Sequence, residues 1–160
     1  MQGDLLTRAT ADVLDEYGDR SQVCELELRS YGGLAAFSGL ISTVRCHEDN
    51  VLLREHLGSG GAGRILVVDG GGSLRCALLG ENVARLALEN GWIGLVVNGC
   101  VRDSEALRLL PLGIHALGTN PRASGKLGGG EVDVQLAFGA VTFVPGKTLY
   151  VDTDGVVVTP

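Results

Sequence analysis

Hydrophobic positions change their spacing several times along the chain, and two stretches have the pattern of strands that are buried on both faces. Arg64–Asp69 (RILVVD) and Trp92–Asn98 (WIGLVVN) are almost continuously apolar, which is typical of central strands in a parallel sheet. Between them, Glu81–Asn90 repeats apolar residues at helical spacing, and Gly91 follows at the position where a helix commonly ends. This order predicts a parallel strand–helix–strand unit with a right-handed crossover.

Weaker patterns extend this unit in both directions. Together they predict a single-domain α/β protein, residues 1–160, with a central parallel βαβαβ unit and a β-rich C-terminal part that forms hairpins or a second sheet layer. The further helices expected are Thr10–Tyr17, ended by Gly18; a helix capped by Asp49 or Asn50 that runs through Leu57 and is ended by Gly58; and Ser104–Leu110. The further strands expected are Cys24–Leu28, Leu40–Cys46, Ile114–Leu117, Val132–Phe138, Val141–Val144, Thr148–Val151 and Val156–Thr159.

Composition narrows the class of protein. With 160 residues, 45% apolar and 20% charged, the chain fits one folded domain. None of the four cysteines forms a CxxC pair, so we expect four reduced, buried thiols. The net charge of −6 and the scattered basic residues argue against direct nucleic-acid binding. Without a signal-peptide pattern or an apolar run of roughly 20 residues, the protein is expected in the cytoplasm, with no membrane partner.

Two glycine-containing loops follow the buried strands, where ligands bind in open α/β sheets. They are Gly70–Ser73 and Gly99–Asp103. The helix that begins near Glu81 should direct its first amides, from Gly80 to Val83, at the same edge. Free amides, the cation of Arg102 and the carboxylate of Asp103 would then converge. The alternative is that Arg102 and Asp103 are ordinary solvated charges.

The combination of these residues resembles the RraA-like family, which includes the metal-dependent 4-hydroxy-4-methyl-2-oxoglutarate aldolases. The shared pattern is an acid, twenty residues and then Arg-Asp, and here it reads Glu81…Arg102-Asp103. Supporting stretches from Tyr31 onward are YGGLAAFSG, ISTVRCHEDN, ILVVDGGGS, NGCVRD, GIHALGTNPR and GAVTFVPG.

The resemblance implies a layered β/β/α fold of the swivelling phosphohistidine-domain type and a homotrimer that can pair into hexamers. It also implies cleavage of 4-hydroxy-4-methyl-2-oxoglutarate to pyruvate, with oxaloacetate decarboxylation through the same pyruvate enolate. Gly80, Glu81, Asn82 and Val83 would hold the carboxylate of a small 2-oxo acid. Arg102 would bind the substrate and stabilise the enolate, and Asp103 would bind Mg²⁺ or Mn²⁺. Glu81 would act through water as acid and base.

Other interpretations compete with this one. Some RraA-like proteins inhibit an RNA-degrading endonuclease, but a regulator does not need the intact acid–Arg-Asp pattern. The longer family aldolases carry a C-terminal carboxylate that reaches a neighbouring subunit's site, and this chain stops at Pro160.

The loop after Asp69 resembles that of a nucleotide or S-adenosylmethionine fold, yet the next strand lacks the ribose-binding acid. The metal-like run Cys46–Asp49 is better explained by helix capping. Lys126 lies in a glycine-rich loop without P-loop spacing, which favours a flexible surface loop, a lid or a subunit contact.

Overall fold

The continuously apolar stretches form the centre of one large mixed sheet in the computed structural model, which describes residues 8–160. Its four parallel central strands are, in spatial order, β3 (Phe37–Arg45), β4 (Ile65–Asp69), β6 (Gly94–Val101) and β7 (Gly113–Thr119). Nearly every side chain of β4 and β6 is buried, because both faces of these strands are covered. The predicted parallel βαβαβ centre is therefore confirmed.

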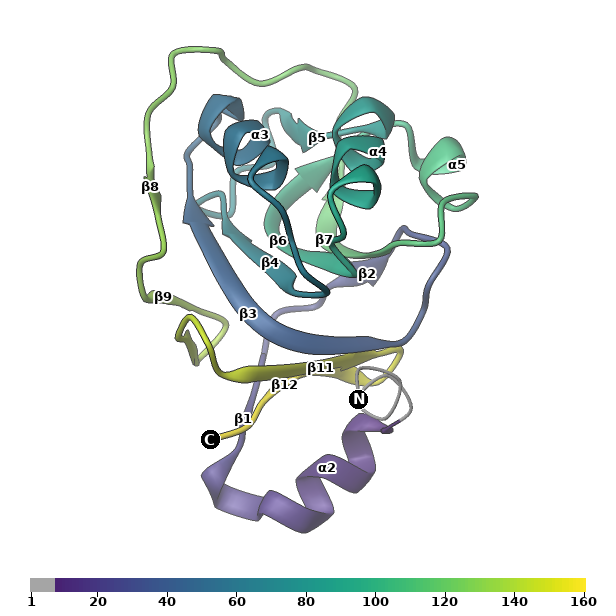
Figure 1. Cartoon of the computed structure of the whole chain (residues 1–160), viewed down its shortest axis with the longest axis vertical. Coiled ribbons are helices and arrows are strands. Elements are labelled where there is room, and N and C mark those ends of the chain that lie inside the picture. The colour runs from purple at the N-terminus through teal and green to yellow at the C-terminus, as the bar shows by residue number, and fades with distance from the viewer. Residues whose placement is uncertain (1–7) are drawn as a thin grey trace.

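Helices α3 (Val51–Gly58) and α4 (Glu81–Glu89) lie side by side on one face of the sheet, as Figure 1 shows. The short helix α5 (Ser104–Leu107) follows β6 on the same side. Helix α4 is amphipathic, and it buries Val83, Ala84 and Ala87 against the sheet.

The remaining strands extend the sheet and form a second layer. Figure 1 shows β11 and β12 beneath the long, curved β3, with helix α2 below them. These further elements are α2 (Thr10–Tyr17), the 3-10 turn η1 (Gly18–Arg20), β1 (Gln22–Val23), β2 (Arg29–Ser30), β5 (Ala77–Leu79), β8 (Glu131–Val132), β9 (Leu136–Phe138), β10 (Val141–Phe143), β11 (Thr148–Asp152) and β12 (Gly155–Val158).

Two hydrophobic cores lie on opposite sides of the central strands. One core packs Leu66 and Val68 of β4 against α3 and α4. The other packs Ile65 and Val67, which alternate with them, against side chains of β9 to β12. The chain is thus a mixed α/β domain with layered packing, and its finer classification as swivelling phosphohistidine-domain-like stays a prediction.

Several expected boundaries change in the structure. Cys24–Leu28 is not a strand: its alternating apolar side chains do face the second core, but its backbone pairs with other segments only around Cys24 and Glu25. The expected loop at Gly99 and Cys100 belongs to β6, which continues to Val101 past an irregularity in its pairing with β7. The expected helix Ser104–Leu110 is a single turn that ends at Leu107.

The four cysteines are free and buried, as expected. Within residues 8–160, no helix has the length and apolar character needed to cross a bilayer.

Candidate functional site

Two adjacent strand ends bring the predicted site residues together. Strand β5 runs parallel to β6, and Leu79 at its end lies opposite Val101. The next residue after β6, Arg102, donates its backbone N–H to the Leu79 carbonyl over 2.9 Å. The start of α4 and the Arg102–Asp103 pair therefore lie at one edge of the sheet, where the sequence predicts them.

The Asp103 carboxylate is held against the first turn of α4. Its Oδ2 atom accepts a hydrogen bond of 2.9 Å from the backbone N–H of Glu81. A Cβ atom at Gly80 would overlap this carboxylate, so glycine is required for the close approach. Asp103 itself has left-handed backbone angles (φ 59°, ψ 41°), which aspartate and asparagine tolerate better than most residues. Its other carboxylate oxygen has no partner within residues 8–160.

The first turn of α4 offers amides as the sequence predicts, though one of them is occupied by Asp103. In the described part of the chain, the backbone N–H groups of Asn82 and Val83 have no acceptor. They border a cavity of about 140 Å³. Free amides at a helix N-terminus attract carboxylates and phosphates.

The side chain of Glu81 is directed elsewhere. Its carboxylate pairs with Arg85 one turn along α4, with 2.7 Å between Oε2 and the nearer guanidinium nitrogen. Glu81 borders a neighbouring open hollow together with Ser104 and Glu105, and it does not line the cavity itself. The residues of the predicted site that do line the cavity are Gly80, Asn82, Val83, Arg102 and Asp103. The structure thus brings the backbone of Glu81 to the site and keeps its carboxylate at the margin.

Sequence reasoning missed that Lys126 belongs to the cavity. Lys126 lines it, and the Lys126 Nζ atom donates to the Oδ1 atom of Asn50 over 2.6 Å and to Ser124 Oγ over 3.4 Å. Asn50 is only 5% exposed, and its amide nitrogen donates to the Leu78 carbonyl of β5. An ammonium is thereby fixed in the same cavity as Arg102.

The interpretation of Lys126 as part of a flexible surface loop is therefore corrected. Its loop is tied down by Asp49, whose carboxylate accepts hydrogen bonds from the backbone N–H groups of Leu127 and Gly128. Asp49 also accepts a hydrogen bond from the backbone N–H of Val51, so it satisfies the first free amide of α3 although Asn50 occupies the N-cap position. In the sequence, the only signals were the adjacent Asp49 and Asn50, which have the pattern of simple caps.

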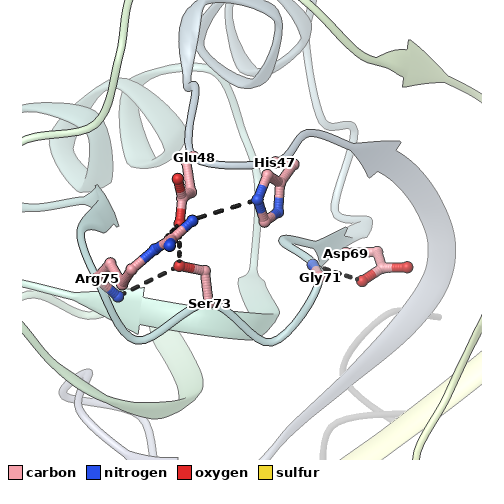
Figure 2. Close-up of polar contacts among 6 residues, drawn as sticks. All are labelled: His47, Glu48, Asp69, Gly71, Ser73 and Arg75. Carbon is pink, nitrogen blue, oxygen red and sulfur yellow. Dashed lines mark hydrogen bonds and ion pairs between the residues drawn. The ribbon is translucent and has the colours of Figure 1, made fainter.

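A second hollow of about 800 Å³ adjoins the cavity at Ala123. Figure 2 shows Ser73 and Arg75 directed at the carboxylate of Glu48, which lies 2.7 Å from Arg75 Nε. These two hydrogen bonds, the one from Arg75 first, lower the pKa of Glu48 to about 2. Glu48 is consequently committed to holding the loop that leads into β5.

The glycine loop after β4 has no free amide for a nucleotide phosphate. The N–H groups of Gly70 and Gly72 donate to the Asn98 carbonyl, and that of Gly71 donates to the Asp69 side chain. The N–H of Ser73 donates back to Gly70. Because these amides are already paired, the loop lacks the feature by which glycine loops cradle phosphates.

A divalent cation fits the site only as a weakly held, largely hydrated ion. Within residues 8–160, no three His, Cys, Asp or Glu side chains lie close enough to share a metal. Asp103 offers one free carboxylate oxygen beside the cavity. Mg²⁺ accepts such a site, because it commonly keeps several waters and uses one or two carboxylates.

Comparison with known proteins gives the family of the chain. Residues 7–158 match the family model described as RraA-like, Aldolase/RraA. The chain belongs to the RraA-like family. The family contains both aldolases and ribonuclease inhibitors, so membership alone does not select an activity.

Solved structures of RraA-like chains are similar over almost the whole length. A protein from Geobacillus kaustophilus HTA426, named S-adenosylmethionine:2-dimethylmenaquinone methyltransferase, is 50% identical, with a TM-score of 0.93 over 95% of this chain and 94% of that one. The RNA-processing inhibitor RraA of Thermus thermophilis is 48% identical, with a TM-score of 0.92 over 96% and 93%. Streptomyces coelicolor RraAS2, of the RNase ES inhibitor family, is 27% identical, with a TM-score of 0.80 over 99% and 86%.

Proposed function

We propose that this RraA-like protein is a divalent-metal-dependent aldolase that cleaves 4-hydroxy-4-methyl-2-oxoglutarate and also decarboxylates oxaloacetate. The observation that carries the proposal is that Arg102, Lys126, Asp103 and the first turn of α4 line the same cavity. It offers cations and free amides for an anionic substrate, and a carboxylate for a metal, in one small volume.

The substrate's 2-oxo acid end would lie between Arg102 and the amides of Asn82 and Val83. Removal of the proton from the 4-hydroxyl breaks the C3–C4 bond, which leaves one pyruvate and the enolate of a second, and protonation at C3 completes the reaction. Arg102 and Lys126 would stabilise the negative charge that develops on the enolate oxygen. Glu81 would accept and return the proton through a water from its position at the margin of the cavity.

Asp103 is the residue that would hold Mg²⁺ or Mn²⁺, and Glu81 N–H fixes the orientation of its carboxylate. When bound, the metal would polarise the 2-oxo group as a Lewis acid. Oxaloacetate shares this chemistry: its C3–C4 bond breaks, carbon dioxide leaves, and the same pyruvate enolate remains.

Two conservative variants test the proposal by separating the roles of neighbouring residues. Asp103→Asn keeps a residue that tolerates left-handed angles but removes the charge, so we expect weaker metal binding by calorimetry and loss of turnover. Arg102→Lys keeps the positive charge but loses the planar fork, so we expect normal metal binding and a kcat/KM lower by about a hundredfold. A wild-type kcat/KM in either folded variant, measured at saturating metal, would refute the site.

A second candidate function is inhibition of an RNA-degrading endonuclease, which the names of the Thermus and Streptomyces relatives favour. Docking on a protein partner has no need of the cavity. Asp103→Asn should therefore leave any inhibition intact while it abolishes catalysis, so one variant measures the two functions independently.

A further inference from the structure

Positive charge is concentrated in the cavity although the chain as a whole carries a net charge of −6. Three cations, Arg54, Arg102 and Lys126, line it, against the single carboxylate of Asp103. This excess is more than a monocarboxylate 2-oxo acid needs, because such a ligand brings only one negative charge.

Two of these cations already have partners. Lys126 donates to Asn50 and Ser124, and Arg102 lies 3.4 Å from the carbonyl oxygen of Pro121 through its Nη1 atom. Within residues 8–160, the guanidinium of Arg54 takes part in no ion pair or hydrogen bond. It is therefore the cation in the cavity that is left without a protein acceptor.

Arg54 is also well positioned by its helix. It lies one turn after Asn50 on α3, so both residues occupy the same face. The amide of Asn50 ties the start of α3 to β5 through Leu78, and α3 packs beside α4 (Figure 1). The backbone of Arg54 thus belongs to a rigid element, and the residue is exposed where it lines the cavity.

We propose that Arg54 binds the second carboxylate of a dicarboxylic 2-oxo acid and so makes the site selective for dicarboxylates. This inference rests on the proposed function, because Arg102 and the α4 amides are assigned there to the 2-oxo acid end. A guanidinium fork pairs with a carboxylate through two parallel hydrogen bonds, and this geometry makes Arg54 suited to a free carboxylate.

The test measures binding with a matched pair of ligands that are not cleaved. 2-Oxoglutarate and 2-oxopentanoate have the same five-carbon chain, and only the first carries a distal carboxylate. Their dissociation constants are measured by calorimetry with excess Mg²⁺ for the wild type, Arg54→Met, Arg54→Lys and Arg122→Met. Arg122 is the control, since it is an exposed arginine that borders the neighbouring hollow and not the cavity.

We expect the wild type to bind 2-oxoglutarate at least about tenfold more tightly than 2-oxopentanoate, the scale of one charged hydrogen-bonded contact. Arg54→Met should lose this preference, Arg54→Lys should keep part of it, and Arg122→Met should keep it. Equal binding of the two ligands by the wild type, an unchanged preference in Arg54→Met, or the same loss in Arg122→Met would overturn the assignment.

Kinetics provide a second readout that a merely structural role would not produce. In oxaloacetate the distal carboxylate is the group that leaves as neutral carbon dioxide, so a cation paired with it opposes the reaction. Arg54→Met should therefore raise KM for oxaloacetate about tenfold without lowering kcat. A fall in kcat with KM unchanged would contradict the assignment.

If the wild type shows the binding preference but cleaves neither 4-hydroxy-4-methyl-2-oxoglutarate nor oxaloacetate, the proposed function fails while the carboxylate subsite stands.

Discussion

Gly80 and Asp103 are packed so closely that a side chain at the first position would displace the carboxylate at the second. The contact explains why a glycine follows β5 at the start of α4. Gly80 has no side chain that could cap the helix. Asp103, which lies two residues after the end of β6, caps the helix instead by accepting a hydrogen bond from Glu81 N–H.

The substitution Gly80→Ala tests this contact. We expect oxaloacetate decarboxylation to lose about a hundredfold in kcat/KM, since a shift of about 1 Å at a reacting centre can have that effect. Gly58→Ala at the end of α3 is the control, because a Cβ atom there would meet nothing within 4 Å. If Gly80→Ala retains the kcat/KM of the wild type, the close packing has no role in the site.

His115 makes stability depend on pH. It is 3% exposed, and within residues 8–160 its Nε2 atom has no hydrogen-bond partner. Burial lowers the pKa of His115, against the opposing effect of its hydrogen bond to the Ala35 backbone. Because the folded pKa lies below the unfolded value of about 6.5, the unfolded chain takes up the proton first as pH falls.

We therefore expect the contribution of His115 to the free energy of unfolding to be complete above a pH of about 6.5. It should decrease as the pH falls from there toward the folded pKa. Denaturant unfolding of the wild type and His115→Gln at several pH values measures the contribution of this residue. His56, whose pKa is also lowered mainly by burial, adds to the decrease in both proteins. An identical pH dependence in the two proteins would show that His115 titrates normally.

At the scale of elements, the strongest hydrophobic patterns predicted the structure best. The buried runs around Val67 and Val96 are central strands, and the amphipathic pattern after Gly80 is a helix, because packing and local preference agree there. The three-residue strand β5 was missed, since its pairing with β6 is a tertiary contact that no short pattern predicts. Cys24–Leu28 shows the converse, because alternation that packs apolar side chains inward does not by itself create pairing between strands.

The candidate site was likewise predicted only in part from the sequence. Arg102, Asp103 and the start of α4 follow strand ends, so topology alone predicts their meeting. Lys126 and Asn50 are 76 residues apart in sequence, and only the tertiary structure brings them together. The pairing of Glu81 with Arg85 was also missed, although their spacing of one helical turn permits it.

Asp49 links two elements, and its substitution should affect stability and activity together. Burial alone would raise its pKa, but hydrogen bonds from the N–H groups of Leu127, Val51 and Gly128 lower it. We expect Asp49→Ala to lower the free energy of unfolding by about 1–2 kcal/mol through loss of the cap and loop contacts. It should also lower kcat/KM, since Lys126 would lose its fixed position. Glu55→Ala is the control, because it is an exposed change on the same helix, and it should alter the free energy of unfolding by no more than about 0.5 kcal/mol. An equal effect of both substitutions would argue against the linking role of Asp49.

At the scale of the whole molecule, the apolar C-terminal strands give no reason to expect subunit contacts. Their side chains, among them Leu136, Phe143, Leu149 and Val156, lie in the chain's own second core. The homotrimer stays a prediction from family resemblance, and surface leucines such as Leu127 and Leu109, which are 98% and 85% exposed, are candidates for the contact.

Light scattering on the purified protein measures the assembly directly. We expect a mass three times the 16.6 kDa of one chain, or six times for paired trimers. Leu127→Glu should shift the mass toward the monomer if the loop beside the cavity lies in the interface, with the exposed change Glu55→Gln as a control. A single-chain mass for the wild type at micromolar concentration would contradict the trimer.

The most direct test of the proposed function is release of pyruvate from oxaloacetate, with and without a chelator. Since Mg²⁺ alone promotes this decarboxylation, each rate is corrected by a reaction that contains metal but no protein. We predict that EDTA abolishes the protein-dependent rate, that excess Mg²⁺ or Mn²⁺ restores it, and that Asp103→Asn stays inactive in either condition. Full protein-dependent activity in excess chelator, or an active Asp103→Asn variant, would contradict metal-assisted catalysis in this cavity.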